Sequence, residues 1–191
     1  MSFPSEVSTY VGRVRAFRTI DWIVYTAWVG MMLGLVFATG GFLVTGARAG
    51  IAFPGEAWLV PCGAAVFTGA IAFDTIGHRT VYREYLEEAE GLVHGVTIFC
   101  GIASCVLLCA ATGPRHFLWV PAMVMTVLSF FYSVVDEAFH WRRYVSRRSD
   151  RVEMWAHVFI FIGHGTMMLG WWTWYFGGYQ GAAETAAVLF R

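Results

Sequence analysis

Acidic residues and histidines recur in this sequence at a spacing of four residues. Asp74 precedes His78 by four residues, and Glu90 precedes His94 by the same interval. Residues four apart lie on one face of an α-helix, so each pair would present a carboxylate and an imidazole side by side. Carboxylate oxygens and imidazole nitrogens together bind iron, manganese or zinc, and sets rich in imidazole suit copper. The spacing therefore predicts metal ligands carried on helices.

The same two pairs occur a second time, in the same order, further along the chain. Four of the six histidines follow an acidic residue by four positions, although only 13 of the 191 residues are acidic. Chance is a poor explanation for this match, which indicates an internal repeat built of ligand-type residues. The second copy consists of Asp136, His140, Glu153 and His157, and the likeness extends to Tyr82 with Tyr144 and to Glu87 with Asp150.

The composition indicates where these ligands lie. Hydrophobic residues make up 58% of the chain and charged residues 14%, and the mean hydropathy is +0.58. A chain of this size with so few charges is too apolar for an ordinary soluble domain and is typical of an integral membrane protein. The formal net charge is zero, so no nucleic-acid partner is indicated and the lipid bilayer is the expected surrounding.

Five apolar segments are each long enough to cross the roughly 30 Å hydrocarbon core of a bilayer as a helix. They cover residues 22–44, 58–77, 91–112, 118–139 and 152–176. We expect a single transmembrane domain over residues 1–191. Its parts are an N-terminal segment with the first span (1–57), a first repeat hairpin (58–112), a second repeat hairpin (118–176) and a tail (177–191).

The predicted fold is an all-α integral membrane protein in which spans two to five form a four-helix bundle from two tandem helical hairpins. Arginines concentrate before the first span, between spans two and three, and between spans four and five. Short basic loops stay in the cytoplasm, so this distribution predicts a cytoplasmic N-terminus and an external C-terminus, in a bacterial inner membrane. All eight repeated residues would then lie near the cytoplasmic face.

Eight carboxylate and imidazole ligands are enough for a two-metal centre. Iron is the preferred metal, with copper, zinc or manganese also compatible with these donors. The arrangement resembles in design the di-iron carboxylate bundles, in which helices carry Glu and His three residues apart; only Glu137 and His140 have that spacing here. An Asp and a His four apart also resemble, locally, the C subunit of copper-dependent membrane monooxygenases.

The leading functional hypothesis is a di-iron oxidoreductase or monooxygenase that acts on an apolar substrate near the cytoplasmic face. Its electrons would come from a donor protein or from other membrane subunits. Two alternatives stay open. His164, seven residues after His157 on the same helix face, could instead be a cofactor ligand, binding haem b in a cytochrome subunit together with His94 or His157. The chain could also be a non-catalytic metal-binding subunit or a metal transporter.

Simpler interpretations exist for single residues. An acid and a histidine four apart can form a local charge pair at a helix end. Glu90 and Glu153 can favour the first turn of their helices through the helix dipole. Asp21, at the mouth of the first span, is expected to cap a helix or to anchor it at the membrane interface, with a contribution to the polar site as the minor alternative. The metal hypothesis therefore depends on the quartet being matched twice.

Overall fold

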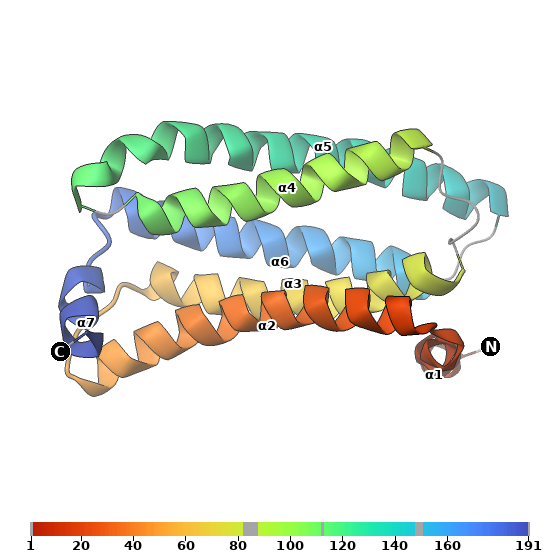
Figure 1. The fold of residues 1–191 in the computed structure, drawn as a ribbon, viewed down its shortest axis with the longest axis horizontal. Coiled ribbons are helices and arrows are strands. Elements are labelled where there is room, and N and C mark those ends of the chain that lie inside the picture. The colour runs from red at the N-terminus through yellow and green to blue at the C-terminus, as the bar shows by residue number, and fades with distance from the viewer. Residues whose placement is uncertain (1, 82–87, 112, 148–150, 191) are drawn as a thin grey trace. The chain divides into compact units, whose positions relative to one another are not determined.

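The structure is a computed structural model that describes residues 2–81, 88–111, 113–147 and 151–190. Within these ranges the chain is helical apart from short connections and contains no strand, which confirms the all-α prediction. Figure 1 shows the helices in chain order. They are α1 (Phe3–Gly12), η1 (Arg13–Ala16), α2 (Thr19–Arg48), α3 (Gly55–Thr80), α4 (Glu88–Ala110), η2 (Gly113–Leu118), α5 (Trp119–Arg147), α6 (Arg151–Phe176) and α7 (Ala182–Leu189).

Five helical segments are long and apolar enough to cross a membrane. They are α2, α3, most of α4, α6, and a segment over Arg115–Ser146 that covers all of α5 except its last residue. Many of their large apolar side chains are exposed, among them Phe37, Leu92 and Leu169. Exposed apolar surface along helices of this length suits contact with lipid. By length and composition, the five predicted spans are therefore present as helices.

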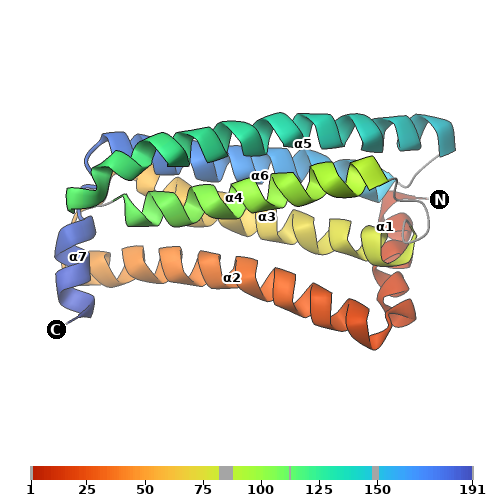
Figure 2. The same cartoon turned by 45° about the horizontal axis from the view of Figure 1, so that its top comes forward.

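The chain divides into two compact units. The first contains residues 1–81 and 151–191, and the second contains residues 82–150. In the first unit α3 packs chiefly against α6, and α2 packs against α3; in the second, α4 packs against α5. Figures 1 and 2 show α3 beside α6, and α4 beside α5. The predicted hairpins join α3 with α4 and α5 with α6, which belong to different units, so these hairpins stay a prediction.

Glycines bring α3 and α6 into close contact. A methyl group added at Gly63 would collide with the backbone of Met167, and one at Gly163 would collide with the backbone of Phe67. A third collision, with Leu59, would follow at Gly170. Small residues at a helix interface let two backbones approach, which is a main source of packing energy between helices in lipid. These glycines explain why α3 takes α6 as its partner.

The second helix pair packs with more space between its backbones. A methyl group at Gly101 on α4 would meet the Ser129 hydroxyl oxygen of α5 at 3.3 Å, a close contact but not a backbone collision. The Ser129 hydroxyl donates a hydrogen bond of 3.4 Å to the carbonyl oxygen of Thr97. The α4–α5 interface is thus set by a small polar side chain facing a glycine.

The N-terminal helix α1 lies against one end of the first unit (Figure 2). Tyr10 is buried and packs with Ile76 of α3 and Val152 of α6. The Arg151 guanidinium donates hydrogen bonds of 2.6 and 2.9 Å to the Glu6 carboxylate. That hydrogen bonding holds the pKa of Glu6 below its usual value. Helix α1 is therefore fixed to the end of α3 and α6 that carries the acidic residues and histidines.

Candidate metal centre

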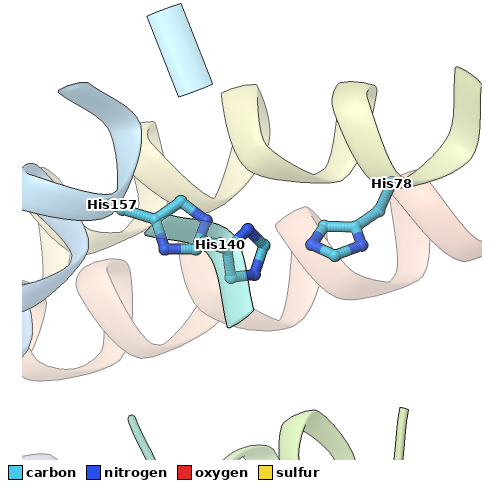
Figure 3. A group of neighbouring side chains, drawn as sticks. All are labelled: His78, His140 and His157. Atoms are coloured by element: carbon cyan, nitrogen blue, oxygen red, sulfur yellow. The ribbon is translucent and has the colours of Figure 1, made fainter. Parts of the chain in front are cut away.

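The first group of predicted ligands forms a cluster between α3 and α6. Nε2 of His157 lies 3.0 Å from Oδ1 of Asp74, and Nε2 of His78 lies 3.5 Å from the same oxygen. Glu153, one turn before His157, is buried with 2% of its surface exposed. Figure 3 shows the imidazoles of His78, on α3, and His157, on α6. We call these four residues, Asp74, His78, Glu153 and His157, the Asp74 cluster.

The antiparallel packing of α3 and α6 positions this cluster. Phe67 meets Gly163 near the middle of the pair, and Asp74, two turns further along α3, meets His157, about two turns earlier on α6. The contacts therefore run in opposite directions along the two helices. Because α3 ends at Thr80 and α6 begins at Arg151, the cluster lies within about three turns of those ends.

The second group of predicted ligands forms an equivalent cluster between α4 and α5. Nδ1 of His94 lies 3.1 Å from Oδ2 of Asp136, and Nε2 of His140 lies 3.7 Å from the same oxygen. Oε1 of Glu90 lies 3.9 Å from Nε2 of His140. Figure 3 labels His140 on α5. We call Glu90, His94, Asp136 and His140 the Asp136 cluster.

The two clusters share one design. In each, a single aspartate oxygen faces the imidazole four residues later on its own helix and an imidazole from the partner helix. In each, the partner helix also contributes a buried glutamate near its first turn. Within each unit the structure thus brings one aspartate together with two imidazoles, and the partner helix carries a buried glutamate. A common focus for all eight stays a prediction.

The two helices of each cluster come from different copies of the repeat. Helices α3 and α4 carry the first copy and α5 and α6 the second. The Asp74 cluster combines the Asp–His pair of the first copy with the Glu–His pair of the second. The Asp136 cluster combines the two remaining pairs. Each cluster therefore needs one helix from each copy.

The separations within each cluster fit metal coordination. Imidazole nitrogens and carboxylate oxygens bind zinc and similar ions at about 2.0–2.2 Å, so two neighbouring ligand atoms of one ion lie roughly 3.0–3.5 Å apart. The aspartate-to-imidazole separations of 3.0 and 3.5 Å, and of 3.1 and 3.7 Å, are close to that range. One ion beside each aspartate could contact both imidazoles with small side-chain rotations.

Charge favours a cation at each cluster. Asp74 and Glu153 are both buried, and so are Glu90 and Asp136. Two carboxylates in a poorly hydrated site repel one another and cost several kcal/mol unless a partner or a bound cation compensates them. Imidazole binds metals in its neutral form. One divalent ion at each cluster would balance its two carboxylates.

A third buried carboxylate has a different environment. Asp21 is fully buried; it accepts a hydrogen bond of 2.9 Å from the backbone N–H of Arg18 and faces the guanidinium of Arg79 at 2.8 Å. The expected capping role at the start of α2 is confirmed. Sequence reasoning missed the link to Arg79, which is the residue after His78 on α3. Local spacing contains no signal for a contact across 58 residues.

His164 is buried on α6, two turns deeper than His157. Its ring stacks on that of Phe67 from α3, with centroids 5.1 Å apart and an angle of 11° between planes. The structure thus places it within the α3–α6 interface. Of the further residues that match in the repeat, Tyr82, Glu87 and Asp150 lie outside the described residues.

Fold and clusters together describe a helical protein with five potential membrane spans and two groups of metal-ligand side chains. Comparisons of the sequence and structure with protein-family models, curated proteins and solved structures find no match. The chemistry of the site itself therefore has to indicate the function.

Proposed function

We propose that this chain is a membrane metalloprotein that binds two iron ions, one at the Asp74 cluster and one at the Asp136 cluster. We further propose that it acts as an oxidoreductase on an apolar substrate near the cytoplasmic face. An electron donor or another membrane subunit would supply electrons. The four-helix bundle and the cytoplasmic N-terminus predicted from the sequence are part of this proposal.

One observation carries the proposal, namely that the same ligand arrangement forms twice. Asp74 faces two imidazole nitrogens at 3.0 and 3.5 Å, and Asp136 faces two at 3.1 and 3.7 Å. A charge pair at the end of one helix explains a contact within that helix. It does not explain why an imidazole from the partner helix meets the same oxygen in both units. Ionisable groups kept within membrane spans are by default functional.

The donor set supports iron and redox chemistry. Each cluster offers two carboxylates and two imidazoles, and within the described residues no cysteine belongs to either cluster. Hard oxygen donors mixed with imidazole suit iron, whereas thiolates would favour zinc or copper(I). Four protein ligands leave positions of a six-coordinate ion open, and open positions are what a catalytic metal needs to bind a reactant.

Metal analysis of the purified full-length protein in detergent tests the proposal. We expect two iron ions per chain after expression with iron, and about one ion in Asp74→Asn and in Asp136→Asn, because each change replaces the carboxylate between two imidazoles with a weaker ligand. Asp21→Asn is the matched control, since it alters a buried aspartate that belongs to neither cluster. It should keep both ions.

Two results would contradict the metal assignment. Fewer than one ion per intact wild-type chain, without chelator in the preparation, would end it. A Soret band with stoichiometric haem would replace it with the cytochrome alternative. For the redox part, we expect the iron-loaded, chemically reduced protein to consume dioxygen faster than the metal-free protein. Equal rates would leave a metal-binding subunit or a metal transporter as the better function.

A further inference from the structure

In each cluster, one histidine lies on the same helix as the glutamate. These two histidines, His157 in the Asp74 cluster and His94 in the Asp136 cluster, differ in solvent exposure. The side chain of His94 is 32% exposed, whereas that of His157 is 6% exposed. Both imidazoles lie at nearly the same distance from their aspartates, 3.1 and 3.0 Å. The distances are therefore nearly equal, although His94 faces its aspartate through Nδ1 and His157 through Nε2, while the exposure of the two imidazoles differs.

Two glycines flank His94 on the surface of α4. Gly91, three residues before His94, lies on the same face of the helix, and Gly95 is the next residue after His94 along the chain. A methyl group added at either glycine would meet no atom within 4 Å. The equivalent positions beside His157 on α6 hold Met154 and Val158. Both of these neighbours of His157 carry side chains, although Val158 is 43% exposed, whereas the two neighbours of His94 carry none.

A second difference occurs seven residues deeper in each helix pair. In the α3–α6 pair, the rings of Phe67 and His164 stack and fill the interface. The equivalent residues of the α4–α5 pair are Ser129 and Gly101, which face each other. A hydroxymethyl group and a hydrogen atom occupy far less volume than two rings. The side chains at these two positions are therefore smaller in the α4–α5 pair.

We propose that the Asp136 cluster is the open metal site, where a small uncharged molecule of about the size of dioxygen reaches the metal past Gly91 and Gly95. The Asp74 cluster is the closed site and keeps only its protein ligands. This inference rests on the proposed function, because it assigns different roles to the two metal ions proposed there.

The surface around the glycines decides which molecules approach. Leu92, next to Gly91, is 70% exposed, and Phe99, one turn beyond Gly95, is 65% exposed. Helix α4 is apolar enough to span a membrane, so this face meets hydrocarbon or the lipid interface. Small uncharged molecules partition into that environment, whereas anions pay a large desolvation cost. The path therefore favours uncharged ligands.

Nitric oxide is a suitable probe, because it is uncharged, diatomic and binds iron(II). The full-length protein, reduced and iron-loaded in lipid nanodiscs, would be titrated with nitric oxide while the electron paramagnetic resonance signal of the adduct is quantified. Iron content would be measured on the same samples. We expect one adduct per chain with two irons. Two adducts, or none, with both irons present would overturn the inference.

Substitution of the glycines tests the path. Gly95→Val places an isopropyl group beside His94, and we expect it to weaken nitric oxide binding by about tenfold or more while both irons stay bound. Gly91→Leu provides a second test of the same opening. Gly34→Val on α2 is the matched control, because a side chain there also meets no atom within 4 Å. Unchanged binding in both α4 variants would refute the path.

The aspartate variants assign the adduct to one cluster. Asp136→Asn should lose the nitric oxide adduct as its iron content falls towards one ion. In Asp74→Asn, which should lose the other ion, the ratio of adduct to iron should rise from one half towards one. The reverse pattern would overturn the inference. Iron content that never reaches two would instead refute the proposed function, so the two failures are distinguishable.

Discussion

The α3–α6 and α4–α5 pairs form the same ligand arrangement on differently packed helices. In the first pair, glycines at 63 and 163 bring the backbones into contact, and Phe67 stacks on His164. In the second pair, Ser129 faces Gly101 across a wider interface. The aspartate-to-imidazole distances nevertheless agree closely. Four-residue spacing and antiparallel register are therefore enough to build the cluster, while the packing around it is free to differ.

The largest difference between the pairs should appear when their interfaces are overfilled. Gly163→Leu forces a side chain into the backbone of Phe67, so we expect the α3–α6 pair to lose about 3 kcal/mol or more of stability. Gly101→Ala on α4 meets only the Ser129 hydroxyl oxygen and should cost less than about 1 kcal/mol. Unfolding in mixed micelles measures both. Equal losses would mean that the two interfaces are packed alike.

The second-largest difference in stability should come from truncating Phe67 and Ser129, which occupy equivalent positions in the two helix pairs. Phe67→Ala leaves a cavity beside His164, and we expect a loss of about 3 kcal/mol in the free energy of unfolding. Ser129→Ala removes only a long hydrogen bond to Thr97 and should cost below about 1 kcal/mol. The same unfolding assay applies. A loss in Ser129→Ala as large as that in Phe67→Ala would contradict the asymmetry.

The contact between Asp21 and Arg79 lies within the first unit and should have a smaller effect on stability. Asp21→Asn removes the charge that faces Arg79 and weakens the cap of α2, so we expect a loss of about 2 kcal/mol, below that of a fully buried pair because Arg79 is partly exposed. Metal content at both clusters should be unchanged. A combined loss of stability and one ion would show that Asp21 supports the Asp74 cluster.

The smallest effect should come from the link between α1 and α6. The hydrogen bonds from Arg151 lower the pKa of Glu6, so the link stabilises the fold above the pKa that Glu6 has in the unfolded chain. The stabilisation is lost as the pH falls through the lower pKa of the folded protein. Wild type and Glu6→Gln should therefore differ slightly in melting temperature at pH 7 and converge below about pH 4. A constant difference would exclude this ionic contribution.

The sequence predicts the helices and the ligand pairs well, because both depend on local information. Apolar length identifies the spans, and the interval between Asp74 and His78 specifies a shared helix face. The partner of each helix is not local. Spans that are apolar on every side lack the polar stripe that would identify their packed face. Gly63 and Gly163 were the available signal for α3 with α6, and the contact between Asp21 and Arg79 had none.

Because each cluster takes one helix from each copy of the repeat, neither half of the chain contains a complete site. A single ancestral hairpin could have assembled such sites only by pairing with a second, identical polypeptide. Fusion of two copies would then have let one site become open while the other kept its covering side chains, a divergence that an identical pair of hairpins could not achieve.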